Sequence, residues 1–154
     1  MRSNRGFTLI ESLIATAILV PGLVGVALLF PHLIKTNLAS KQTSAATLVI
    51  ADKMESMRVL PLNNAALTVG GGLNPASPVT SYHDYVVVAA NGTLTASATI
   101  PAGASSALNA YLRIWQVSGT NPKTITVLVQ ALNGGGSGQR REAIRSSTIV
   151  TDTF

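Results

Sequence analysis

The sequence predicts an α+β fold in which one long amino-terminal helix packs on an antiparallel sheet. Three observations predict this fold. Residues 7–34 form an almost uninterrupted apolar run, residues 35–60 place apolar side chains at helical spacing, and from Tyr82 onward the apolar residues recur at every second position. A chain of 154 residues is long enough for one such domain with an appendage.

The composition favours a membrane-anchored protein over a soluble enzyme. Hydrophobic residues make up 47% of the chain and charged residues only 11%, whereas charged residues are usually about 25%. There is no cysteine, which excludes a disulfide framework, a thiolate metal site and a cysteine nucleophile. The formal net charge is +5, but the basic residues are scattered and aromatic residues are few, so the pattern of a nucleic-acid-binding surface is missing.

The apolar run, residues 7–34, is long enough to cross a bilayer as a helix, for which about 20 residues suffice. Its only formally charged side chain is Glu11. Arg2 and Arg5 precede the run, and the positive-inside rule therefore places the amino end in the cytoplasm and the rest of the chain across the membrane.

Three interpretations compete for this amino-terminal segment. A cleaved secretory signal has a shorter apolar core that ends in a small-residue cleavage site, but the A-x-A sequence at residues 15–17 lies inside the run. A plain membrane anchor leaves Glu11 unexplained, because a carboxylate near the bilayer centre costs about 2.5–3.5 kcal/mol. The third interpretation gives this carboxylate a partner.

Residues 5–11, Arg-Gly-Phe-Thr-Leu-Ile-Glu, resemble the processing signature of type IV prepilins. In that family a short basic leader and a glycine precede an apolar helix with a glutamate at its fifth position. The resemblance implies that a prepilin peptidase cleaves between Gly6 and Phe7 and then methylates the new amine of Phe7. A glycine suits the extended backbone that a protease cleft requires, since it has no Cβ.

Glu11 then acquires a role in subunit assembly. It follows Phe7 by four residues, or about 6 Å of helix rise, so the Glu11 carboxylate of one subunit can meet the Phe7 amine of a neighbour. Burial of the two charges as a pair offsets much of the cost of burying either alone. The alternative is a carboxylate that reaches the membrane interface without a partner.

The expected organisation has four parts: a cleaved leader (1–6), a transmembrane and assembly helix (7–34), an amphipathic continuation of that helix (35–60) and a globular head (61–154). Ala46, Ile50, Met54 and Met57 share one helical face and are expected to contact the head. Pro21 and Pro31 interrupt the apolar run and predict kinks. The resemblance implies that residues 20–29 lose helicity on assembly.

The head is expected to begin with a loop over residues 61–81, which is rich in Gly, Asn and Pro, and to continue as strands between residues 82 and 151. Asn91-Gly92 predicts a hairpin turn, and residues 134–138 predict a flexible glycine-rich loop. The expected strands are 82–90, 93–100, 110–117, 123–132 and 141–151.

No catalytic constellation can be recognised. His32 has no carboxylate nearby in sequence, and His83 and Asp84 are neighbours on one strand and so face opposite sides. The glycine runs lack the Lys-Ser/Thr of a phosphate-binding loop. We therefore expect no enzyme, no cofactor and no metal site.

Further features resemble minor pilins of the PilV type: the helix end at residues 53–58 followed by Pro61, a strand with Arg113 and Trp115, and the loop at residues 121–123. The resemblance implies a minor subunit that primes a type IV pilus or sits near its tip. The implied partners are prepilin peptidase, other major and minor pilins, the inner-membrane assembly platform and inner-membrane lipid. The implied location is the inner membrane in a single pass, with a cytoplasmic leader and a periplasmic head, and later the pilus at the cell surface.

Two alternatives remain open. A pseudopilin of type II secretion carries almost the same amino terminus and differs in the machine that assembles it. The other alternative is a head that binds a surface or DNA. It rests on a cluster near the glycine-rich loop, formed by Arg140, Arg141 and Arg145, which could contact phosphate weakly. Such a cluster is more often a solvated strand end, and no nucleic-acid partner is expected.

Overall fold

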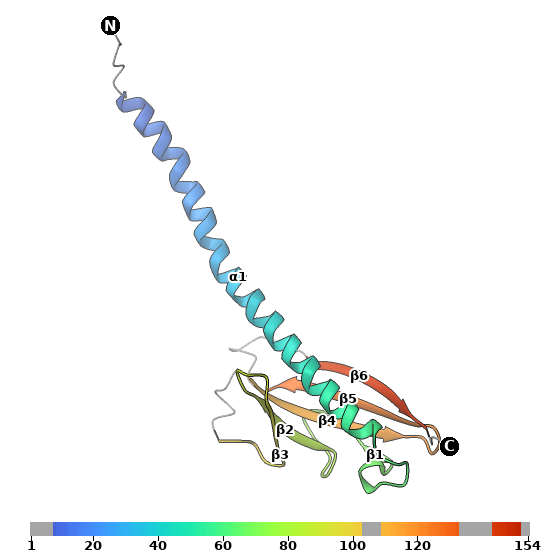
Figure 1. The fold of residues 1–154 in the computed structure, drawn as a ribbon. Helices are drawn as coiled ribbons and strands as arrows, with labels where there is room; N and C mark the ends of the chain where they lie inside the picture. Colours follow the sequence, from blue (N-terminus) through green and yellow to red (C-terminus); the bar gives the residue numbers. More distant parts are fainter. Residues whose placement is uncertain (1–7, 103–108, 133–142, 152–154) are drawn as a thin grey trace. The chain divides into compact units, whose positions relative to one another are not determined.

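A computed structural model describes residues 8–102, 109–132 and 143–151 of the chain (Figure 1). Its internal contacts divide the chain into two units, residues 1–40 and residues 41–154. The first unit contains most of one long helix, and the second contains the end of that helix and a six-stranded sheet. The expected α+β architecture, one long helix packed on an antiparallel sheet, is confirmed.

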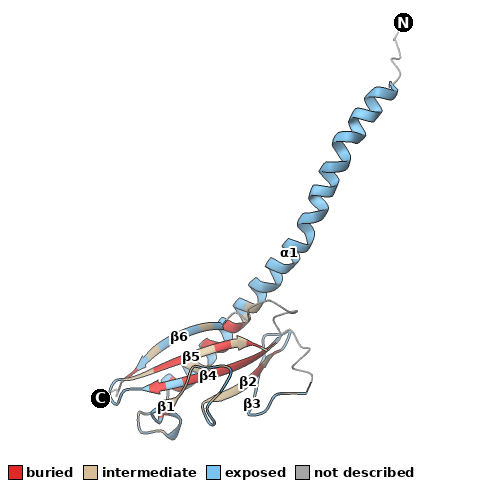
Figure 2. Ribbon diagram, turned by 180° about the vertical axis from the view of Figure 1, so that it is seen from behind, coloured by how far each residue is buried: buried red, intermediate tan, exposed pale blue. Residues whose placement is uncertain are grey.

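The helix α1 (Leu9–Arg58) is 50 residues long and continues through Pro21 and Pro31. It ends two residues before the expected end at Leu60. Every described side chain of the first unit is exposed, as the pale blue ribbon of Figure 2 shows. By length and composition, α1 could cross a membrane. The loss of helicity over residues 20–29 concerns the assembled state and stays a prediction.

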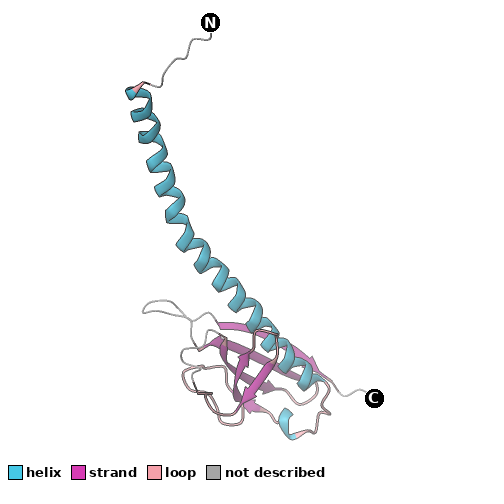
Figure 3. Ribbon diagram, turned by 60° about the vertical axis from the view of Figure 1, so that its left-hand side comes forward, coloured by secondary structure: helices cyan, strands magenta, loops and turns pink. Residues whose placement is uncertain are grey.

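The second unit is built around a sheet, magenta in Figure 3, whose neighbouring strands are all antiparallel. The strand order is β3-β2-β4-β5-β6 (Figure 1). A two-residue strand pairs with β4 beyond the end of β2. The strands are β1 (Gly70–Gly71), β2 (His83–Val88), β3 (Leu94–Ser97), β4 (Ala110–Ser118), β5 (Lys123–Ala131) and β6 (Ala143–Val150).

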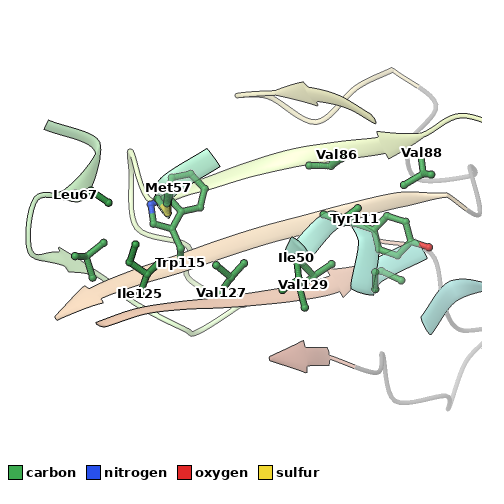
Figure 4. Packing of buried hydrophobic residues seen from close by; sticks show 14 of the residues in the cluster. Ile50, Met57, Leu67, Val86, Val88, Tyr111, Trp115, Ile125, Val127 and Val129 are labelled. Atoms are coloured by element: carbon green, nitrogen blue, oxygen red, sulfur yellow. The ribbon is translucent and has the colours of Figure 1, made fainter. Parts of the chain in front are cut away.

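The core of the second unit lies between the last four turns of α1 and one face of the sheet (Figure 4). Ala46, Ile50 and Met57 are buried there and Met54 is half-buried, so the predicted helical stripe is confirmed. Val49, which has no exposed surface, belongs to the same face and was not part of the predicted stripe. The alternation of β5 places Ile125, Val127 and Val129 in this core, as the sequence predicts.

Two segments differ from the sequence-based expectation. The loop expected over residues 61–81 contains the 3₁₀ helix η1 (Ala65–Leu67) and β1. β3 is four residues long, where residues 93–100 were expected to form a strand. The turn at Asn91-Gly92 is confirmed, because Gly92 has a positive φ of 83° and the N–H of Ala89 donates to the Thr93 carbonyl. The glycine-rich loop at residues 134–138 lies outside the described residues.

Candidate functional site

The first candidate site is the start of α1. The Thr8 carbonyl accepts hydrogen bonds from the N–H groups of Glu11 and Ser12, at 3.1 and 3.2 Å. The Thr8 hydroxyl also accepts from the Glu11 N–H, at 3.4 Å, as a helix-capping side chain does. This arrangement puts the Glu11 carboxylate in the first turn of α1, where the helix dipole favours a negative charge. Gly6 and Phe7, the expected cleavage and methylation residues, lie outside the described residues.

Around Glu11 the helix surface is apolar. Leu9, Ile10, Leu13 and Ile14 are between 56% and 81% exposed. The Thr16 hydroxyl donates to the Ser12 carbonyl one turn back, at 2.6 Å, so its polarity is satisfied within the helix. Glu11 is the only formally charged side chain within residues 8–34. Its carboxylate can pair with a cation on another molecule.

A second group of charged side chains lies in the second unit, around Arg113 of β4, whose side chain is 4% exposed. Its guanidinium donates from Nε and Nη2 to the two carboxylate oxygens of Asp84 on β2, both at 2.8 Å. Its Nη1 donates to Asp52 Oδ2 of α1 at 2.8 Å and to the Val49 carbonyl at 3.0 Å. Arg113 therefore joins β4 to both β2 and the helix.

Lys53 completes this group, which we call the Arg113 cluster (Asp52, Lys53, Asp84, Arg113 and Trp115). The Lys53 ammonium lies 3.6 Å from the centre of the Trp115 ring, a cation–π contact, and 3.8 Å from Asp84 Oδ2. Two positive and two negative charges thus balance within one cluster.

Burial shapes the acid–base behaviour of these groups. It lowers the pKa of Lys53 below its usual value, against the opposing attraction of Asp84. Burial also acts to lower the pKa of Arg113, but the hydrogen bonds and charge of Asp84, followed by those of Asp52, outweigh it and raise that pKa. Burial raises the pKa of Tyr111, a core residue whose hydroxyl donates to the Gln42 carbonyl of α1.

The Arg113 cluster has a structural role, because it links α1, β2 and β4. In the part of the chain that the structure describes, no buried side-chain polar atom lacks a hydrogen-bond partner, and no group of three His, Cys, Asp or Glu side chains could hold a metal ion. The sequence singles out Arg113 and Trp115 only through a resemblance and does not predict the cluster. A signal existed, because a charged residue inside an apolar strand needs a buried partner.

The prediction that His83 and Asp84 do not converge is confirmed. Asp84 binds Arg113 on the helix side of the sheet, whereas the His83 ring lies 2.9 Å from the Val79 carbonyl and packs edge-on against Tyr85.

Comparison with known families bears on the first candidate site. Residues 1–29 match the family described as the prokaryotic N-terminal methylation motif. No curated protein and no solved structure showed significant similarity to the chain. The motif implies processing by a prepilin peptidase and assembly with other pilins, which indicates a structural subunit. The amino-terminal motif at residues 1–29 and the helix-on-sheet fold support a type IV prepilin-like protein.

Proposed function

We propose that this chain is a minor subunit of a type IV pilus, which primes assembly or sits near the tip. The observation that carries the proposal is the single carboxylate of Glu11 in the first turn of an otherwise apolar helix segment whose described side chains are all exposed. That carboxylate lies within the matched methylation motif. An isolated charge on such a surface is costly in a membrane unless assembly provides its partner.

In the proposed mechanism, prepilin peptidase cuts between Gly6 and Phe7 and methylates the Phe7 amine, which keeps its positive charge. When subunits stack through α1, the Glu11 carboxylate of one meets the Phe7 amine of the next. A buried pair of this kind costs much less than two separate buried charges. It also fixes the axial register of the helices, as a buried polar residue does in a coiled coil.

The proposed topology follows from the same segment. The leader (1–6) lies in the cytoplasm, residues 7–34 cross the inner membrane, and the head lies in the periplasm until the assembly platform moves the subunit into a pilus. The exposed apolar side chains of α1 support this arrangement, because such a surface requires lipid or other helices around it.

Processing is tested by intact-mass analysis of membrane and pilus fractions from the native host. The mature chain is expected to begin at Phe7 with an N-methylated amine. A mature chain that keeps Met1, or that starts after Ala17, would contradict the prepilin interpretation.

The minor role rests on the PilV-like helix end at residues 53–58 and on the small head. Quantitative mass spectrometry of sheared filaments is expected to find this chain far below the main pilin. Near-equal amounts would make it a major pilin. If the chain is instead found in a secretion pseudopilus and not in pili, it is a pseudopilin of a type II secretion system and not a pilus subunit.

A further inference from the structure

One edge of the sheet, formed by β6, is long and regular. β6 pairs with β5 over eight consecutive residues, from Lys123 opposite Val150 to Gln130 opposite Ala143, and the register runs without an interruption or bulge. β6 is the last strand in the sheet order (Figure 1). Among the residues that the structure describes, no strand pairs with its outer edge.

This outer edge lacks most of the features that usually protect an edge strand. Proteins shorten such strands, place lysine or proline in them, or bend them with a bulge. β6 has eight residues, contains no lysine, proline or glycine, and carries a single charge at Arg145. The opposite edge of the sheet is different, because β3 has only four residues.

The side chains beside this edge indicate the chemistry of a partner. Arg145, Ser147 and Ile149 alternate along β6 on the sheet face away from the helix, and all three are exposed. Ile149 is 62% exposed, Ser147 shares a hydrogen bond with Thr126 of β5, and Arg145 forms no ion pair with any described residue. A partner strand that fits would bring an acidic side chain beside Arg145 and an apolar one beside Ile149.

We propose that the outer edge of β6 binds a strand from the head of a different pilin-type subunit, one with an acidic residue beside Arg145. This proposal rests on the proposed function. Such a strand completes the backbone hydrogen bonds that the edge leaves open, and it adds a charge pair that selects the partner.

A second copy of this chain fits the edge less well. Antiparallel pairing of β6 with another β6 relates the two copies by a two-fold axis, so their helices would not point the same way along a polar filament. Pairing with β3 of another copy would use at most the four residues of that strand. The eight-residue edge therefore favours a strand from a different chain.

Photo-crosslinking of filaments in the native host tests the pairing. The variant Ser147→p-benzoylphenylalanine carries the crosslinker on β6, and Thr95→p-benzoylphenylalanine, at an exposed position of β3, is the matched control. We expect the β6 variant to give an adduct, identified by peptide mass spectrometry, with a strand in the head of a different pilin-type subunit.

Each other outcome overturns the pairing. An adduct with β6 of a second copy would show a symmetric dimer, and an adduct with a protein outside the pilin class would show another partner. A yield at Ser147 no higher than at Thr95, with the wild-type chain present in filaments, would overturn this inference alone. Absence of the wild-type chain from filaments would overturn the proposed function and the pairing together.

The charge preference has its own test in the crosslinking variant. Arg145→Glu is expected to lower the adduct yield by about threefold or more, because an attractive cross-strand pair becomes a repulsive one. Arg58→Glu, an equal charge change at the exposed end of α1, should leave the yield unchanged. Replacement of the partner's acidic residue by lysine should restore binding of the Arg145→Glu chain. An unchanged yield for Arg145→Glu would overturn the acidic-partner assignment.

Discussion

Arg113 shows how a single residue joins elements that are distant in the sequence. Its guanidinium is almost fully buried, and its four hydrogen bonds reach α1 and β2. Burial of a guanidinium is costly unless its charge is paired and its donors are used, and here both conditions are met. Replacement of a buried ion pair by well-packed apolar side chains of similar volume is often neutral or stabilising. We therefore infer that the cluster mainly fixes the position of the last turns of α1 on the sheet.

Removal of Arg113 should therefore destabilise the head strongly. Arg113→Met removes both hydrogen bonds to Asp84, whose side chain is 16% exposed, and leaves that carboxylate only the longer 3.8 Å contact with Lys53. We expect a loss of about 3–5 kcal/mol in the free energy of unfolding. Asp52→Asn should cost about 1 kcal/mol or less, because the Asp52 side chain is 49% exposed. Denaturant unfolding of the full chain in detergent can be followed by the fluorescence of Trp115, the only tryptophan. Equal losses for the two variants would contradict this account.

The lowered pKa of Lys53 makes its contribution to folding stability depend on pH. Comparison with Lys53→Met isolates this contribution. Burial lowers the pKa of Lys53 below 10.5 in the folded chain, so the unfolded chain holds more protons between that lowered pKa and pH 10.5. The Lys53 contribution to stability therefore rises with pH in this window. The raised pKa of Tyr111 acts in the opposite direction above pH 10, but it is present in both proteins. We expect the stability of wild type relative to Lys53→Met to rise as the pH approaches 10.5, and a constant difference would refute the assignment.

The Arg113 cluster also shows why residue-level contacts are hard to predict. Asp84 and Asp52 lie 29 and 61 residues from Arg113 in the sequence. A charge within an apolar strand predicts that some partner exists, but only the register of β2 with β4, which places Asp84 opposite Arg113, decides which one. The Glu11 carboxylate was easier to single out, because its segment contains no other charge.

At the scale of elements, the sequence predicts the helix and the strands whose apolar side chains recur at a regular period. It does not predict elements that lack such a period. The helical stripe at Ala46, Ile50 and Met57 and the alternation of β5 both follow from side-chain period, and both are confirmed. β1 has no side chains that could show a period, because it consists of Gly70 and Gly71. It forms because a backbone without Cβ can approach Tyr82 and Trp115 closely.

Gly71 is the sharper test of this close approach. It has a φ of +83°, and a Cβ there would lie 2.7 Å from the Tyr82 ring and would also collide with the Trp115 carbonyl. We expect Gly71→Ala to destabilise the head by about 1–3 kcal/mol. Gly72→Ala is the matched control, since its Cβ would meet Val79 at an ordinary 3.5 Å. Trp115 fluorescence during denaturant unfolding measures both, and equal stability of the two variants would disprove the packing argument.

At the scale of the molecule, the two units have different chemistry. The second unit contains a core of buried apolar side chains, whereas the described part of the first unit exposes all of its side chains. The first unit therefore needs lipid or neighbouring helices, and Glu11, the one charged side chain of the apolar run at residues 7–34, needs a partner there. The sequence alone predicts this division, because an apolar run with a single carboxylate cannot form a soluble helix surface. What completes the first unit lies in other molecules.

The variant Glu11→Ala separates the assembly role proposed for Glu11 from membrane insertion, processing and folding. Glu11→Ala removes a charge from an apolar span, so insertion should not suffer, and the Gly6-Phe7 junction is unchanged, so cleavage should persist. Because Glu11 belongs to the first unit, the unfolding midpoint reported by Trp115 should also stay the same. Filaments should nevertheless lack the variant, because the Phe7 amine of a neighbour loses its buried partner at a cost of about 3–5 kcal/mol.

Gly6→Val is the contrasting variant, since it should leave an uncut precursor in the membrane with Glu11 intact. Immunoblots that separate precursor from mature chain, together with quantification of each variant in sheared filaments, distinguish the two defects. If Glu11→Ala enters filaments as well as wild type does, the charge pair between subunits is wrong, although processing at Gly6-Phe7 would still place the chain among the prepilins. If Glu11→Ala instead accumulates uncut, the carboxylate serves recognition by the peptidase, and its role ends before assembly begins.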